Sequence, residues 1–176
     1  QPALESRHHV QAWTFLRAHG EQPAAAEGKH VYGVVFEVGL EEGLDLLAAY
    51  EDRTARYHNY SGAGVVWERP DDRLDGQIDA LLAHSAAVVQ RIGPWDQPRL
   101  PAPGTGQTRV SFLTPSGLHF GQGTMEALYG YPLAVPLHRD DSGKPFVHRI
   151  GAPLFSVGHV SGHALIALST AGEVGV

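Results

Sequence analysis

The stretch between residues 30 and 68 restricts the possible folds more than any other part of the chain. It consists of short runs rich in Val, Leu, Tyr and Phe, each separated from the next by Gly, Asp or Ser. Short strands joined by tight turns produce this pattern. We therefore expect four strands in up-and-down antiparallel order, formed by HVYGVVFEV, LDLLAAY, TARYHNY and VVWE.

Two helices are expected to flank this meander. Residues 3–19 carry apolar side chains at helical spacing, and Gly20 follows where a helix commonly ends. The second helix begins after the acidic pair Asp71 and Asp72, which suits the helix dipole, and it ends before Gly93. The expected apolar faces consist of Leu4, Val10, Trp13 and Leu16 in the first helix, and of Leu74, Ile78, Leu81, Leu82, Val88 or Val89, and Ile92 in the second.

The part of the chain after the second helix begins with a proline-rich segment. Residues 93–107 hold four prolines, so we expect an extended surface loop there. Pro98 to Pro101 matches the P-x-x-P pattern that proline-binding modules read, but a wrapping loop is the favoured interpretation. The expected elements that follow are a hairpin at 109–123, a helical turn at 124–130, a turn at 140–145, and strands in FVHRI, LFSVGHV and HALIALST.

This order of elements predicts one α+β domain over residues 1–176. A chain of 176 residues with 43% apolar content can bury one core but is short for two. Helix, meander, helix and hairpins in succession favour antiparallel pairing over a doubly wound parallel sheet. The expected fold is an antiparallel β-meander with flanking helices and a C-terminal set of hairpins, the last of them within residues 138–176.

Composition excludes several classes of function. The chain has no cysteine, which excludes disulfides, thiolate nucleophiles and Cys-ligated metals and favours a reducing cytoplasm. The net charge of −6 and the scattered arginines argue against nucleic acid as a partner. No apolar run approaches the roughly 18 to 20 residues that cross a bilayer. We therefore expect a cytoplasmic protein that binds neither nucleic acid nor membrane.

The hairpin at 109–123 carries the main candidate site. Pro115 suits the first central position of a type I turn, and Gly117 suits the left-handed bulge residue that follows it. This interpretation predicts a three-residue loop with Thr114 opposite Leu118 and places Arg109, Ser111 and His119 on one face.

Those three residues, Arg109, Ser111 and His119, are the candidate catalytic or ligand-binding side chains. A Ser-His pair with a nearby Arg could support hydrolase-like chemistry. The favoured interpretation is the solvent side of a half-buried hairpin.

Glycines near the end of this hairpin predict no cofactor. Gly121 and Gly123 precede a possible helix start at Thr124, but Glu126 stands where a dinucleotide fingerprint needs its third glycine. The Gly-Lys-Ser/Thr of a phosphate loop is absent from the sequence, and so is the G-x-S-x-G elbow of serine hydrolases.

His159 and His163 are the candidate metal ligands. Their i, i+4 spacing would place two imidazoles on one side of a helix. Ser161-Gly162 instead favours a hairpin turn, in which the two rings point to opposite faces, and no Glu stands in the H-E-x-x-H position. We therefore expect no metal site.

Four strings in the chain, RTARYHNYSG, LDGQIDALL, IGPW and SFLTPSGLHFGQG, resemble a family of bacterial proteins of unassigned function. The resemblance covers about residues 10 to 135. It implies no activity, cofactor or site residue.

Two functions follow from these observations. The leading hypothesis is a binding or protein-interaction module that self-associates or docks a protein partner through an exposed sheet edge or the proline-rich loop. The alternative is a small hydrolase-like or ligand-binding protein with its site around Arg109, Ser111 and His119.

Overall fold

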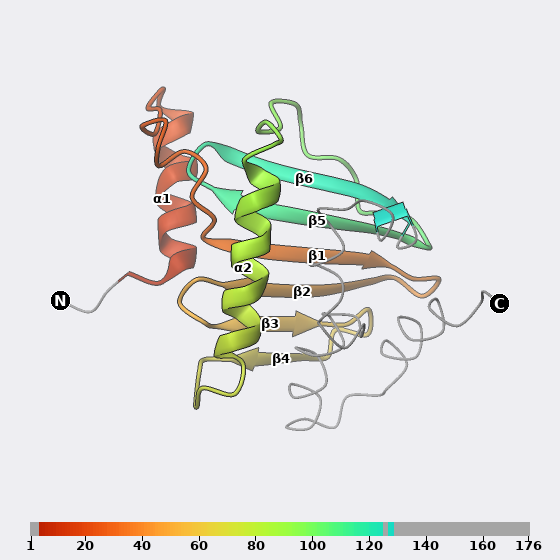
Figure 1. Ribbon diagram of the computed structural model, residues 1–176. Coiled ribbons are helices and arrows are strands. Elements are labelled where there is room, and N and C mark those ends of the chain that lie inside the picture. Colours follow the sequence, from red (N-terminus) through yellow and green to blue (C-terminus); the bar gives the residue numbers. More distant parts are fainter. Residues whose placement is uncertain (1–3, 125–126, 129–176) are drawn as a thin grey trace.

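A six-stranded antiparallel sheet organises the structure (Figure 1). The computed structural model describes residues 4–124 and 127–128. Its elements are α1 (Ser6–Ala18), β1 (Gly33–Gly39), β2 (Leu44–Tyr50), β3 (Ala55–His58), β4 (Gly64–Trp67), α2 (Asp75–Val89), β5 (Gln107–Thr114) and β6 (Gly117–Thr124). The strand order is β4-β3-β2-β1-β5-β6, so the hairpin of β5 and β6 extends the meander beside β1.

This architecture confirms the predicted α+β fold with a β-meander. The four strands between residues 30 and 68 and both helices form where the apolar runs predict them. Helix α2 begins at Asp75, a few residues later than expected. The predicted turn at 140–145 and the three C-terminal strands lie outside the described residues. No helix in the described part of the chain has the length and apolar character needed to cross a membrane.

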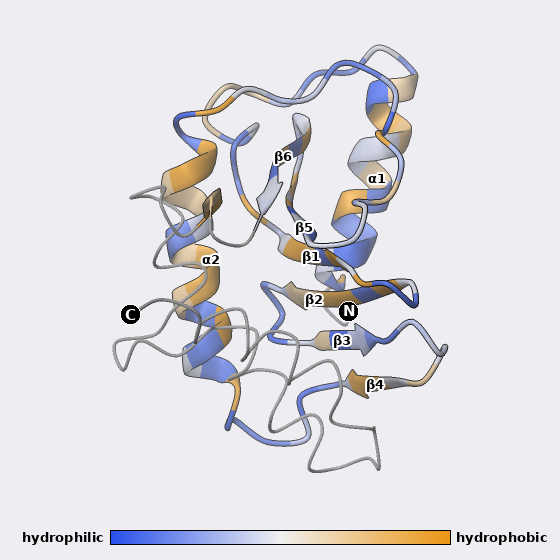
Figure 2. Cartoon of the chain, turned by 90° about the vertical axis from the view of Figure 1, so that its right-hand side faces the viewer, coloured by the Kyte–Doolittle hydropathy of each residue, from blue (hydrophilic) through white to orange (hydrophobic). Residues whose placement is uncertain are grey.

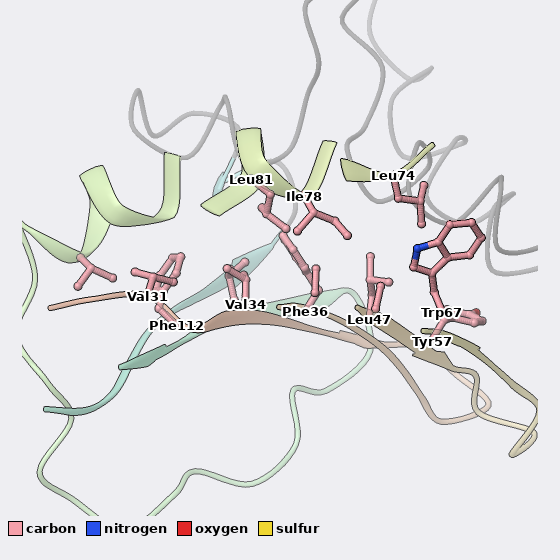
Figure 3. Packing of buried hydrophobic residues seen from close by; sticks show 14 residues of the cluster. Val31, Val34, Phe36, Leu47, Tyr57, Trp67, Leu74, Ile78, Leu81 and Phe112 are labelled. Atoms are coloured by element: carbon pink, nitrogen blue, oxygen red, sulfur yellow. The ribbon is translucent and has the colours of Figure 1, made fainter. Parts of the chain in front are cut away.

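The core lies between the sheet and α2. We call this side of the sheet, which carries Val34 and Phe36, the α2 face. Figure 3 shows Leu74, Ile78 and Leu81 extending from α2 toward these strand side chains. All five residues are at most 1% exposed, so this contact excludes water. The cluster also contains Val31, Leu47, Ala49, Ala55, Tyr57, Trp67, Val89, Val110 and Phe112.

Helix α1 lies on the other side of the sheet from α2, beside the strand ends (Figure 2). We call this side the α1 face, and it carries Glu37, which pairs with Arg109 of β5. Its start is held at the β2–β3 turn, where the Ser6 backbone N–H donates to Asp52 Oδ2 at 2.8 Å. The predicted apolar face of this helix is wrong at both ends. Leu4 is 62% exposed and Leu16 is exposed, because the helix lies beside the strand ends, where Ser6 bonds Asp52 and Arg17 bonds the Pro115 carbonyl.

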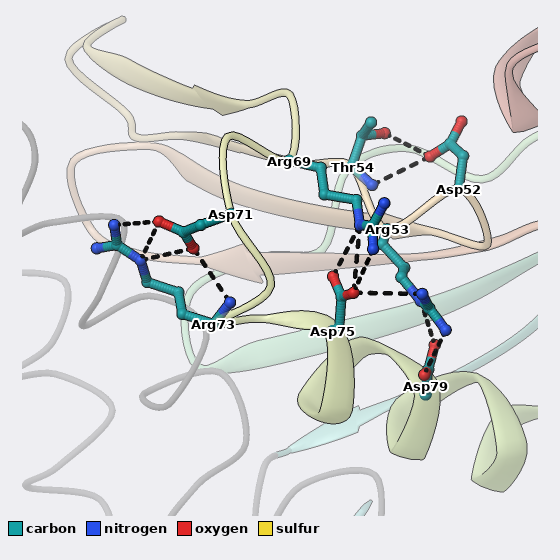
Figure 4. Close-up of polar contacts among 8 residues, drawn as sticks. All are labelled: Asp52, Arg53, Thr54, Arg69, Asp71, Arg73, Asp75 and Asp79. Carbon is teal, nitrogen blue, oxygen red and sulfur yellow. Dashed lines mark hydrogen bonds and ion pairs between the residues drawn. The ribbon is translucent and has the colours of Figure 1, made fainter.

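Two arginines fix the start of α2 to the turns of the meander (Figure 4). Arg69 donates to both carboxylate oxygens of Asp75, from Nε at 3.1 Å and from Nη2 at 2.7 Å. Arg53 donates to both oxygens of Asp79 and to Asp75. The hydrogen bond from Arg69 lowers the pKa of Asp75, so the carboxylate stays charged.

Both arginines adopt positive φ, 63° for Arg53 and 53° for Arg69, where a β-carbon is unfavourable. Replacing Arg53 with alanine or glycine removes the same ion pairs, but glycine adopts this φ freely. We therefore expect R53G to unfold at a higher urea concentration than R53A. An alanine variant that is at least as stable would show that the turn carries no strain.

Candidate functional site: strand β6 and its edge

The β5–β6 hairpin has a two-residue loop, so the predicted three-residue loop is wrong. Thr114 pairs with Gly117, and Phe112 pairs with His119. Gly117 has a φ of 123°, so it uses the freedom of glycine, but it does so as the first paired residue of β6 and not as a bulge. A shift of one residue turns every β6 side chain to the other face relative to β5.

The three candidate catalytic residues therefore do not share a face. Arg109 and Ser111 lie on the α1 face, where Ser111 pairs with Phe120. His119 pairs with Phe112 and lies on the α2 face, in the core. The sheet separates the imidazole from the hydroxyl and the guanidinium, so the predicted trio is not assembled. The prediction that this side is solvent-facing is also wrong, since all three residues are buried.

Arg109 organises the proline-rich loop. It is 2% exposed, and its Nε donates to Gln122 Oε1 at 2.9 Å. Its remaining donors bond the carbonyls of Leu100 and Pro101 and face Glu37, whose Oε2 lies 3.4 Å from Nη1. A guanidinium with these partners is a structural anchor, because its donors are occupied by the protein itself.

The proline-rich loop consequently lies on the α1 face, over β1, β5 and β6. Arg99, in the P-x-x-P segment, donates to Glu37 Oε1 at 3.0 Å. The loop ends beside β1, where the Gly106 N–H donates to the Gly39 carbonyl at 2.9 Å. A β-carbon on Gly39 would overlap the backbone of Gly104, so this close approach requires glycine. These contacts agree with a wrapping loop.

Ser111 is buried beneath this cover. It is 2% exposed, and its Oγ has no hydrogen-bond partner among the described residues. A nucleophilic serine needs a base within hydrogen-bond reach. The structure places no such group beside this hydroxyl within residues 4–124.

His119 is held in the core by the hairpin turn. Its Nδ1 lies 3.3 Å from Thr114 Oγ1 and 3.4 Å from the Gly117 carbonyl, so a protonated Nδ1 can donate to either oxygen. Its Nε2 is buried without a partner among the described residues. Burial lowers the pKa of His119, and the positive charge of Lys29 lowers it further. The ring is therefore neutral near pH 7.

The candidate metal ligands His159 and His163 lie outside the described residues. Within residues 4–124 and 127–128, no group of three or more His, Asp or Glu side chains is placed to hold a metal ion.

The outer edge of β6 is the feature of this region that sequence reasoning did not single out. The Trp95 N–H donates to the Leu118 carbonyl at 2.7 Å, so this carbonyl points away from β5. Backbone direction alternates along a strand, so the N–H and C=O groups of Phe120 and Gln122 also point outward. Within the described part of the chain, no hydrogen bond occupies these outward groups.

The two edges of the sheet differ. Strand β4 has four residues, and the charged Glu68 and Arg69 follow it directly. Strand β6 has eight residues, pairs with β5 without a bulge, and contains no Lys, Arg, Asp, Glu or Pro. Short length, charge and proline are the usual protections of an edge strand. The β4 edge is short and flanked by charge, and the β6 edge lacks all of these protections.

Comparisons with models of protein families, with curated proteins and with solved structures found no match to this chain.

Proposed function

We propose that this protein is an interaction module that self-associates by adding strand β6 of one copy to strand β6 of another. The observation that carries the proposal is the outer edge of β6 at Phe120 and Gln122, whose outward backbone groups have no hydrogen bond among the described residues, whereas the β4 edge on the opposite side of the sheet is short and flanked by charge. An edge strand offers its free backbone N–H and C=O groups to a further strand, and this mode of recognition needs no catalytic residue.

A second copy is the partner that suits this edge best. Pairing of two copies brings the side chains of the same strand close to one another, so like charges along that strand would repel. Strand β6 contains no Lys, Arg, Asp or Glu, and its histidine, His119, is buried and neutral. Its edge is therefore compatible with its own copy, although the chain as a whole carries a net charge of −6.

A proline at position 122 tests this proposal. The Gln122 N–H points away from β5, so proline removes an outward donor and leaves the β5–β6 ladder intact. Each copy in a dimer then loses one hydrogen bond of about 1 kcal/mol, which weakens association about 30-fold. As its concentration is raised to roughly micromolar, the unchanged protein should show a light-scattering mass that rises from 18.9 kDa toward twice that value. The mass of Q122P should stay at that of one chain over the same concentrations.

Q122A is the matched control, because it also loses the contact with Arg109 but keeps the N–H. It should associate like the unchanged protein, and so should V66E, which adds a charge to the β4 edge. A mass of one chain at every concentration would overturn self-association. A dimer that Q122P leaves unchanged would show that the copies meet elsewhere.

Three finer statements belong to the same proposal. The bacterial family resemblance carried by NYSG, IGPW and the 111–123 string is consistent with a module of this kind but assigns it no partner. The absence of cysteine supports a cytoplasmic location. Docking of a different protein at this edge is the related possibility, and co-purification of such a protein with the unchanged chain but not with Q122P would support it.

A further inference from the structure

The position of Trp95 limits which part of the β6 edge can accept a strand. Its backbone N–H occupies the Leu118 carbonyl, and its indole packs edge-on against Phe120 with ring centroids 5.1 Å apart. The indole Nε1 donates to the Pro98 carbonyl at 3.0 Å, which holds the ring in place. The proline-rich loop therefore blocks the N-terminal end of the edge and leaves open the segment that follows, residues 120–124.

We infer that two copies pair antiparallel over residues 120–124, with the two-fold axis at Gln122; this inference rests on the proposed self-association. Phe120, Gln122 and Thr124 are the residues of this segment whose backbone groups point outward. With the axis at Gln122, this residue lies opposite Gln122 of the partner subunit, and Phe120 lies opposite Thr124 of the partner subunit. The outward groups of Phe120 and Gln122 are then all paired. An axis at residue 120 would require the Leu118 carbonyl, which Trp95 already occupies. Axes at 121 or 123 leave an outward group of the segment unpaired.

The side chains around Gln122 fit this symmetry. On the α2 face its neighbours are Gly121 and Gly123, which lie opposite each other across the axis, so no side chains collide there. The space where a β-carbon of Gly121 would stand is open. On the α1 face, Arg109 Nε donates to the side-chain oxygen of Gln122 at 2.9 Å, which holds this side chain against β5.

A single engineered cysteine can locate the axis, because the chain has none of its own. Directly opposed residues of a hydrogen-bonded pair have Cα atoms about 5.5 Å apart, within the range of a disulfide. We expect Q122C to form a covalent dimer in oxidised glutathione, seen on a non-reducing gel, at a rate at least tenfold above T124C. With the axis at Gln122, the two copies of residue 124 lie roughly 14 Å apart along the strands.

The outcomes separate this inference from the proposed function. V66C, on the β4 edge, is the control for random collision and should crosslink no faster than T124C. Rapid crosslinking of T124C, or of a mixture of Q122C and T124C chains but not of Q122C alone, would move the axis and overturn the inference while leaving self-association standing. If the unchanged protein has the mass of one chain, both fail.

Discussion

Replacing Arg109 with methionine is expected to lower the free energy of unfolding by about 3–5 kcal/mol. The substitution keeps a long side chain in place but leaves the carboxylate of Glu37, which is 4% exposed, without its buried counter-charge. It also removes the donors that bond the carbonyls of Leu100 and Pro101. Urea unfolding followed by circular dichroism measures the loss.

Two further variants test whether the buried charge is the cause. R99M removes the other partner of Glu37, but that arginine side chain is 62% exposed, so the expected loss is less than about 1 kcal/mol. Adding E37Q to R109M removes the uncompensated charge and should recover part of the stability. If R109M unfolds within 1 kcal/mol of the unchanged protein, the guanidinium does not anchor the loop.

The meander could be predicted from sequence because its information is local. Each strand of β1 to β4 is a short run followed by its own turn residues, and neighbours in sequence are neighbours in the sheet. The same holds for α2, because the helical spacing of its own apolar residues defines the face that packs against the sheet.

The register of the β5–β6 hairpin could not be predicted because it depends on a distant contact. Ser116 bonds the Gly28 carbonyl through both its N–H, at 3.0 Å, and its hydroxyl, at 2.6 Å. These contacts hold Ser116 within the loop, so that Gly117 becomes the first residue of β6. Residue 28 lies 88 positions earlier, and turn preferences at Pro115 contain no information about it.

The burial of Arg109 could not be predicted from the sequence for a similar reason. Alternation along β5 places Arg109 on the side of the sheet away from the α2 core, and a side chain on that side is expected to face solvent. The proline-rich loop returns over that face and covers it. One signal was present in the sequence: Glu37 interrupts an otherwise apolar run in β1, and a carboxylate in such a strand predicts a buried cation nearby.

Acidification is expected to destabilise the fold through His119. Burial lowers its pKa in the folded protein, while in the unfolded chain the imidazole titrates near 6.5. Below that pH the unfolded chain therefore binds more protons than the folded one. The stability contributed by the neutral ring is fully present above the unfolded pKa and is lost as pH falls toward the folded pKa. In that window the loss approaches about 1.4 kcal/mol per pH unit.

The variant H119F isolates this effect, because it removes one of the eleven histidines of the protein and leaves the others in place. Phenylalanine retains a buried ring and removes the proton-binding nitrogens, and Thr114 keeps its bond to the Gly117 carbonyl at 2.9 Å. The difference in unfolding free energy between H119F and the unchanged protein should therefore grow in favour of H119F as the pH is lowered from 7.5 to 5. A constant difference over this range would show that folding does not lower the pKa of His119 and would contradict the prediction.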